Sequence, residues 1–354
     1  MQWITLAQYM KFSSILISWY EVNKRDLPWR NTADPYKIWL SEIILQQTRV
    51  NQGLAYYLKF IEAFPEIVSL ANANEEQVLK LWQGLGYYSR ARNLHLTAKV
   101  IRDKYKGVFP SDPMEIASLK GIGEYTTAAI SSFAFGHPLA VVDGNVVRVL
   151  SRYFGIYIPF DTKEGKKIFR ETAKLHLDKK IPGTYNQAIM EFGAGQCKPA
   201  NPDCFTCPLN KSCIALAKGN IFDLPVKKKR IEVKKRNFNY LINSNYNKIQ
   251  IKQRKEKDIW QNLYEFPLIE SEKRISKTQM ERRLKTKVSL VANYIHKLSH
   301  RDINASFWVV NDFKPELLFS SGYIQTNIDE LQKFPVSRLI DRFIKEVMIS
   351  EPQK

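Results

Sequence analysis

Residues 119–130 read LKGIGEYTTAAI, and residues 140–150 read AVVDGNVVRVL. In the first stretch, Gly121 and Gly123 lie between two helical patterns. Two glycines allow a tight turn, and they let backbone N–H groups at the start of a helix approach a phosphate. On its own, the turn is more typical of a plain packing corner between helices. Asp143 precedes an apolar helical pattern, so it can be a helix cap, a functional carboxylate, or both.

All four cysteines of the chain lie in one short stretch, as Cys197, Cys204, Cys207 and Cys213. Two disulfides are not expected, because the long chain shows no secretion signal and cytosolic thiols are kept reduced. Four thiolates suit a tetrahedral Zn²⁺ ion or a [4Fe–4S] cluster, and ligand type alone leaves both open.

The spacing of these cysteines, C-x6-C-x2-C-x5-C over residues 197–213, matches the cluster loop of the endonuclease III superfamily of DNA glycosylases. The glycine turn, Asp143 and the cysteine loop also follow the order and distances of that superfamily. The resemblance implies a [4Fe–4S] cluster held by the four cysteines, with Asp143 as the catalytic aspartate. It also implies a DNA-binding helix–hairpin–helix motif built on Gly121, Ile122 and Gly123.

Tyr125 occupies the position in which bifunctional members of the superfamily carry a lysine nucleophile. Without that amine no Schiff base forms there, so efficient β-lyase activity is not expected. Lys120 is close in sequence but lies on the other side of the hairpin.

Within the superfamily, the chain most closely resembles the MutY family, the glycosylases that remove adenine from A/G mismatches. The resemblance rests on four segments: LPWR at 27–30, WLSEIILQQTRV at 39–50, WQGLGYYSRARNL at 82–94 and NQAIMEFGAGQC at 186–197. It implies that Glu42 protonates adenine and that Asp143 stabilises the sugar cation and helps water to add.

Elementary chemistry agrees with that division of labour. Protonating a ring nitrogen makes adenine a better leaving group, and general acids commonly contribute about 10²–10⁴-fold. In the apolar segment WLSEIIL, desolvation is expected to raise the pKa of Glu42, whereas an Asp143 that faces an oxocarbenium ion should stay ionised. Without the resemblance, Glu42 would be interpreted as a surface helix glutamate.

Four further residues take roles from the same resemblance. Tyr125 and Asn145 are similar to residues that line the catalytic pocket, although each also fits a local cap or a packed aromatic. Gln47 and Tyr87 resemble the family's inserting residues, which fill the gap when the target base is rotated out of the duplex. Tyr87 fits an ordinary interface or core aromatic equally well.

The sequence predicts two domains. Residues 1–225 carry helical patterns with glycine and proline between them, which predicts a mainly α domain. Residues 226–236 read VKKKRIEVKKR, a run of like charge that predicts a linker. Residues 237–354 change to β-rich runs such as NFNYLIN and INASFWVV with a few helical stretches, which predicts a smaller α+β domain.

The second domain resembles the Nudix-like C-terminal domain of the same family, which senses 8-oxoguanine opposite the adenine. Its reading loop is similar to Leu298, Ser299 and His300, with Leu298 in place of the usual aromatic residue. A leucine can wedge but cannot stack, so selectivity is expected to rest mainly on Ser299 and His300. The sequence lacks the glutamate-rich helix of catalytic Nudix enzymes, so this domain is expected to recognise and not to hydrolyse.

The chain carries 54 Lys and Arg against 35 Asp and Glu, a formal charge of +19 that suits a polyanionic partner such as DNA. The N-terminal stretch reads as an amphipathic helix and not as a signal peptide, and no stretch has the length of a membrane span. We therefore expect a cytoplasmic, nucleoid-associated monomer with no membrane partner.

Together these features predict a base-excision-repair enzyme that hydrolyses the N-glycosidic bond of adenine mispaired with 8-oxoguanine or guanine in double-stranded DNA, without lyase activity. One alternative is a bifunctional endonuclease III-like glycosylase and AP lyase for oxidised pyrimidines, against which Tyr125 and the second domain count. The other is an iron–sulfur DNA-binding regulator without chemistry, against which Glu42 and Asp143 count together.

Overall fold

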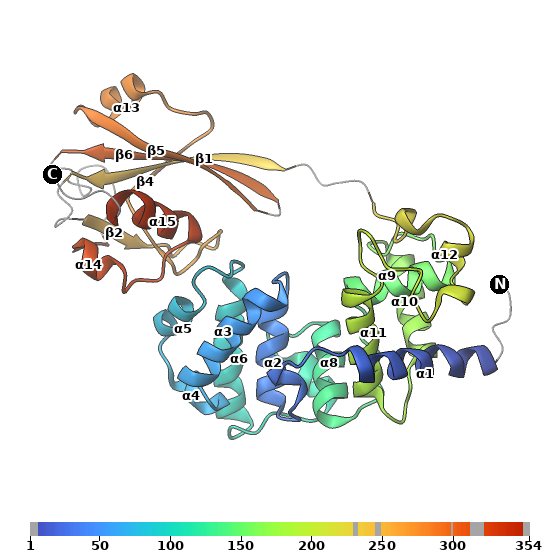
Figure 1. Cartoon of the computed structure of the whole chain (residues 1–354). Helices are drawn as coiled ribbons and strands as arrows, with labels where there is room; N and C mark the ends of the chain where they lie inside the picture. The colour runs from blue at the N-terminus through green and yellow to red at the C-terminus, as the bar shows by residue number, and fades with distance from the viewer. Residues whose placement is uncertain (1–5, 229–232, 245–248, 299, 312–321, 350–354) are drawn as a thin grey trace. The chain divides into compact units, whose positions relative to one another are not determined.

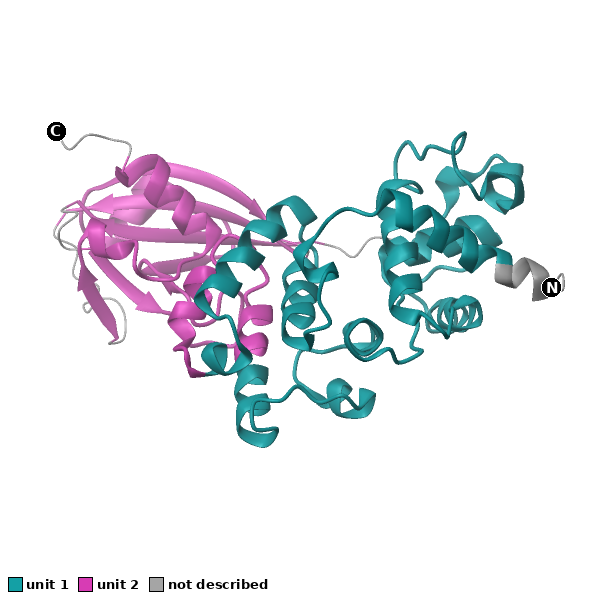
Figure 2. Ribbon diagram, turned by 60° about the horizontal axis from the view of Figure 1, so that its bottom comes forward, with its two compact units in different colours: residues 1–71, 96–229 teal, residues 72–95, 230–354 magenta. Residues whose placement is uncertain are grey.

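The computed structural model describes residues 6–228, 233–244, 249–298, 300–311 and 322–349. The chain forms two compact units, which Figure 2 draws in different colours. The first unit holds residues 1–71 and 96–229, and the second holds residues 72–95 and 230–354. The predicted domains place residues 72–95 in the first domain, whereas the contacts group this segment with the second unit. The domain bounds themselves stay a prediction.

The first unit is helical (Figure 1). Its helices are α1 (Leu6–Asn23), α2 (Pro35–Leu45), α3 (Val50–Ala63), α7 (Pro113–Ser118), α8 (Glu124–Phe135), α9 (Gly144–Phe154), α10 (Lys163–His176), α11 (Pro182–Gly195) and α12 (Ile214–Ala217). Short 3₁₀ turns are η1 (Pro28–Arg30), η2 (Asn210–Ser212) and η3 (Ile221–Asp223). The points at which the two units divide fall in α4 (Ile67–Asn72) and α6 (Ser89–Lys104).

The core of the first unit lies where α11 packs against α1, α8 and α9. Apolar residues spaced three or four apart give each of these helices one buried face. Those faces bury Leu16, Ala129, Leu150, Ile189 and Phe192. This packing fixes the positions of α8, α9 and α11, whose residues line the candidate site.

Local sequence determines where three of these helices begin. Before α2, the Asp34 side chain accepts a hydrogen bond from the backbone N–H of Tyr36, and a proline fits the first helical position. Before α9, the Asp143 side chain accepts one from the N–H of Val146. Helix α8 begins directly after Gly123.

The second unit combines α5 (Glu75–Leu81) with strands and helices from the C-terminal part of the chain. The strands are β1 (Lys234–Asn243), β2 (Ile249–Gln253), β3 (Tyr264–Glu265), β4 (Leu268–Ser271), β5 (Val288–Lys297), β6 (Arg301–Val310) and β7 (Tyr323–Thr326). The helices are α13 (Lys277–Leu284), α14 (Ile328–Leu331), α15 (Arg338–Phe343) and the π-helical η6 (Ile344–Ile349). One sheet has the order β4-β1-β6-β5, with β1 and β6 parallel, and the other has the order β3-β2-β7.

Alternate residues of β1 point to opposite faces of the larger sheet. Phe238 and Tyr240 pack in a core with α15, whereas Leu241 packs with Trp308 in a core with α13 (Figure 1). The structure confirms the predicted class, a mainly α part and an α+β part. Within the described ranges, no helix has the length and apolar character needed to cross a membrane.

Candidate active site

A cavity of about 780 Å³ opens in the first unit between α2, α8, α11 and the start of α9. All of the residues predicted to be catalytic line it: Glu42, Tyr125, Asp143 and Asn145. They come from three separate helical segments of the sequence, and the packing of these segments brings the four side chains to one place.

Glu42 lies in the cavity wall with 7% of its surface exposed. The Tyr125 hydroxyl donates a 2.7 Å hydrogen bond to its Oε2 atom. Burial raises the pKa of Glu42 to about 7, and the charge of Asp143 adds to the rise, while the Tyr125 bond and Arg30 oppose it. Near neutral pH a large share of Glu42 therefore carries a proton, the state that a general acid needs.

Asp143 differs from Glu42 in its hydrogen-bond donors. Its Oδ1 accepts from the backbone N–H of Val146 at 2.7 Å, and its Oδ2 accepts from the Asn145 amide at 2.8 Å. Burial raises the pKa of Asp143, and these two bonds oppose the rise because they favour the charged form. With two N–H donors on Asp143 and one hydroxyl on Glu42, a proton shared by the pair resides mainly on Glu42.

Arg148 connects this carboxylate to the cysteine loop. Its guanidinium donates to Oδ1 of Asn145 at 2.8 Å and to the carbonyl oxygen of Cys197 at 2.8 Å. Asn145 in turn donates to Asp143. The amide that orients Asp143 is thus fixed by a side chain that also contacts the first cysteine.

The four predicted cluster ligands line one small pocket: Cys197, Cys204, Cys207 and Cys213. Arg152 holds the loop, because its guanidinium lies 3.5 Å from Sγ of Cys197 and donates to the carbonyl oxygens of Lys198 and Pro199. Burial raises the pKa of Cys207 to about 11. In the part of the chain that the structure describes, no three or more His, Cys, Asp or Glu side chains are grouped for a single metal ion.

The predicted DNA-binding hairpin has the backbone that the two glycines allow. Gly121 has a φ of 84°, in the left-handed region, and Gly123 lies at the N-cap of α8. Both line the cavity, whereas Ile122 is buried. Gly123 supplies no side-chain acceptor to the first N–H groups of α8, and N–H groups at the start of a helix can bind a phosphate.

The two predicted inserting residues both have left-handed backbones, with a φ of 58° at Gln47 and 48° at Tyr87. Non-glycine residues rarely adopt this conformation, and it is concentrated at functional sites. Gln47 is exposed and lines the cavity. Tyr87 is half exposed and belongs to the second unit.

The cavity also contains a charged group to which the sequence assigned no role. Glu191 is buried and accepts hydrogen bonds from Arg25 and Arg30. Burial alone would raise the pKa of Glu191, but these two bonds lower it, so its carboxylate is ionised. Arg30 lies in the motif LPWR, and Glu191 lies in the motif NQAIMEF. Membership of these motifs is the one feature of the sequence that could have singled out the two residues.

In the second unit, the predicted reading loop is the turn between β5 and β6. The N–H of Leu298 donates to the carbonyl oxygen of Arg301 at 2.8 Å. Leu298 packs against the core of the unit, and His300 is exposed. Ser299 lies outside the described residues.

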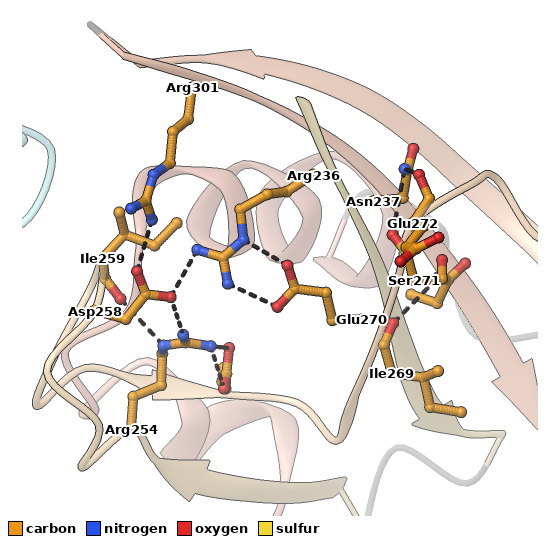
Figure 3. A network of polar contacts seen from close by, with 12 residues as sticks. Arg236, Asn237, Arg254, Asp258, Ile259, Ile269, Glu270, Ser271, Glu272 and Arg301 are labelled. Carbon is orange, nitrogen blue, oxygen red and sulfur yellow. Dashed lines mark hydrogen bonds and ion pairs between the residues drawn. The ribbon is translucent and has the colours of Figure 1, made fainter. Parts of the chain in front are cut away.

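A network of ion pairs lies beside this turn (Figure 3). Arg301 donates to Oδ1 of Asp258 at 2.7 Å, and Arg236 donates to Oδ2 of Asp258 at 2.6 Å. Arg254 contacts the same carboxylate and also pairs with Glu265. Asp258 therefore joins the first residue of β6 to β1 and to the segment after β2.

Comparisons with known proteins agree with the folds of both units. The family model of the HhH-GPD superfamily base excision DNA repair proteins matches residues 40–175, and the NUDIX domain model matches residues 239–346. The adenine DNA glycosylase of Buchnera aphidicola subsp. Baizongia pistaciae is 36% identical over 303 residues, which cover 84% of this chain and 86% of that protein. The chain belongs to the adenine DNA glycosylase family. It is thus a hydrolase of base excision repair, which confirms the predicted family and enzyme class.

Other adenine DNA glycosylases match a smaller part of the chain. The human protein is 40% identical over 220 residues, which cover 59% of this chain and 40% of the human one. Among solved structures, a thermostable thymine-DNA glycosylase aligns with a TM-score of 0.56 and 31% identity over 60% of this chain and 98% of its own. A non-covalent endonuclease III–DNA complex aligns with a TM-score of 0.52, 22% identity and coverage of 61% and 99%, which shows the fold alone.

Proposed function

We propose that this adenine DNA glycosylase removes adenine mispaired with 8-oxoguanine or guanine in duplex DNA, by hydrolysis and without a lyase step. The observation that carries the proposal is the meeting of Glu42, Tyr125 and Asp143 in one cavity. A buried acid with a raised pKa and a carboxylate whose charged form is favoured by N–H donors form a pair of the kind that cleaves glycosidic bonds.

In the proposed reaction, Glu42 gives its proton to a ring nitrogen of adenine. The C1′–N9 bond then breaks, and its electron pair leaves with adenine. The cation on the sugar lies against the carboxylate of Asp143, which stabilises the developing charge. Water adds to C1′, and the proton that it loses returns to the carboxylate pair, so that the enzyme is restored.

The residues of the cavity support a monofunctional reaction. Tyr125 stands at the position of the lysine nucleophile and holds Glu42 by its hydroxyl. Among the described residues that line the cavity, none is a lysine. A Schiff base needs a primary amine at the sugar, and the side chains of this wall supply carboxylates, amides and guanidinium groups instead.

Two features support a mismatch in duplex DNA as the substrate. The start of α8 offers N–H groups to a phosphate, and the formal charge of +19 attracts a polyanion. In the second unit, exposed His300 lies at a turn that the Asp258 network holds in place, as a residue that reads the opposite base requires. Two endonuclease III structures that share this fold are complexes with DNA.

The donor set of the cysteine loop supports a [4Fe–4S] cluster. Four thiols around one pocket match its ligand requirement. When bound, such a cluster would hold the loop through the four sulfur atoms. Iron and sulfide analysis of the pure protein tests this, with four irons per chain expected, and a zinc-containing, iron-free protein contradicts it.

A strand-release assay tests the proposed reaction. The protein is incubated with duplexes that place adenine opposite 8-oxoguanine, guanine, cytosine or thymine, and half of each sample is then treated with alkali. We expect cleavage at adenine only after alkali, and mainly opposite 8-oxoguanine and guanine. Cleavage without alkali, together with a borohydride-trapped adduct, would show a bifunctional enzyme, and binding without release would show a regulator.

A further inference from the structure

Residues 72–95 form part of the second unit, as Figure 2 shows by their colour. Their contacts with the C-terminal part of the chain are specific. The Tyr264 hydroxyl donates to Glu76 at 2.6 Å, and Arg92 donates to the carbonyl oxygen of Gln261 at 2.8 Å. Lys80 donates to the carbonyl oxygen of Phe334 at 3.2 Å.

The loop at residues 83–88 carries the exposed Tyr87 on an unusual backbone. Gly84, Gly86 and Tyr87 all have positive φ angles, of 101°, 74° and 48°. The Trp82 indole donates to the carbonyl oxygen of Gly86 at 2.9 Å, and the Arg90 guanidinium lies 5.6 Å from the centre of the Tyr87 ring. A tyrosine persists in this conformation only where its surroundings hold it there.

Gln83 and Tyr88, the first and last residues of the loop, bind the backbone N–H and carbonyl groups of one residue in the C-terminal part. The N–H of Val336 donates to Oε1 of Gln83 at 3.2 Å, and the carbonyl oxygen of Val336 accepts from the Tyr88 hydroxyl at 3.1 Å. Gln83 also donates to Oδ1 of Asp341 at 2.8 Å. Tyr88 is buried, and its hydroxyl accepts from the N–H of Gly84 at 3.3 Å. Both ends of the loop are therefore fixed by the segment before α15.

We propose that the second unit holds the 83–88 loop in the shape that inserts Tyr87 into the duplex, with Tyr88 and Gln83 as positioning residues. The proposal rests on the proposed function, because insertion serves to extrude the mispaired adenine. Its consequence is that the part of the chain that reads the opposite base also sets the geometry of the wedge. Loss of the hydrogen bonds that Val336 makes with Gln83 and Tyr88 should therefore slow extrusion of the adenine and leave Glu42 and Asp143 unchanged.

Tyr88→Phe tests the proposal, because it removes the hydroxyl and keeps the buried ring. Insertion is measured by the fluorescence of 2-aminopurine placed beside the mismatch, which reports unstacking without any chemistry, and adenine release is measured separately in single turnover. We expect both rates to fall by about three- to tenfold, the value of one or two hydrogen bonds. Tyr264→Phe is the matched control, since it removes a hydroxyl from the same pair of segments away from the loop, and it is expected to leave both rates near those of the unaltered protein.

Equal losses in the two variants, or no loss in Tyr88→Phe, would overturn the proposal. A double-mutant cycle with Tyr87→Ala separates positioning from stability, since Tyr88→Phe should add nothing once the wedge is absent, and an additive loss contradicts the proposal. If Tyr88→Phe lowers the unfolding temperature, Gln83→Leu replaces it in the same assays. If the unaltered protein unstacks the 2-aminopurine but releases no adenine, the proposed function alone is refuted. If it releases adenine and Tyr88→Phe leaves both rates unchanged, the positioning proposal alone is refuted.

Discussion

The carboxylate cavity of the first unit and the reading turn of the second unit are built in opposite ways. In the cavity, Glu42 is buried and Asp143 is half-buried. Glu42 accepts from Tyr125, which lies 83 positions away, and Asp143 accepts from the neighbouring Asn145 and Val146. At the turn, His300 is exposed, and its support comes from Arg301 and Asp258. Under the proposed function, the chemistry depends on burial that raises the pKa of Glu42, whereas recognition depends on ion pairs that hold a surface turn.

The largest effect is expected at the buried acid. Glu42→Gln keeps the shape of the side chain but supplies no transferable proton, so adenine release should fall by about 10²–10⁴-fold in single turnover. Mismatch binding, measured by a gel-shift titration, should stay within about twofold because phosphate contacts are unchanged. Loss of binding and release together would mean that Glu42 is structural.

The second carboxylate is expected to show a smaller loss. Asp143→Asn keeps a side chain that caps α9, because asparagine is favoured at this position, but it removes the charge. Release should fall by about 10²–10³-fold, as when one group that stabilises a transition state is lost. The unfolding temperature serves as the control, and full release by a stably folded variant would show that the charge has no part in the reaction.

A change at the turn between β5 and β6 should alter the preference between opposite bases and not the rate of adenine release itself. Arg301→Ala frees the turn from Asp258, so the preference for 8-oxoguanine over guanine should fall by about three- to tenfold. Release opposite guanine should stay close to that of the unaltered protein. Arg301→Lys restores a charge at Asp258 and should recover part of the preference, whereas equal losses on both substrates would contradict the division of roles.

The smallest effect is expected at Leu298. Leu298→Phe introduces an aromatic ring, which can stack on a base in addition to making apolar contact. Binding to a duplex with 8-oxoguanine should tighten by about two- to threefold. Because Leu298 packs against the core, a loss of affinity would show that the side chain supports the turn from within and does not contact the base.

Sequence motifs indicated which residues line the cavity together, but not how the charged groups in its wall pair. Glu42, Tyr125, Asp143 and Asn145 lie in continuous motifs, and the structure brings them into one cavity. The pairs of Glu191 with Arg25 and Arg30 join residues 166 and 161 positions apart, and local patterns contain no information on such pairing.

The basic segment at 226–236 illustrates the same limit. Its charge predicts a linker, yet β1 already begins at Lys234. Arg236 is accommodated in the strand because Asp258 and Glu270 neutralise it. The grouping of residues 72–95 with the C-terminal part likewise depends on bonds such as that from Tyr88 to Val336, which lie 248 positions apart.

The pH dependence of adenine release tests the role of Glu42 most directly. Single-turnover rates are measured between about pH 5 and pH 9 for the unaltered protein and for Tyr125→Phe. The raised pKa of about 7 means that Glu42 is protonated below that pH, so the rate should fall as pH rises through 7. The Tyr125 bond lowers this pKa, so its removal should move the fall to higher pH. A rate that stays level across the range, or a fall at the same pH in both proteins, would contradict the assignment of Glu42 as the acid.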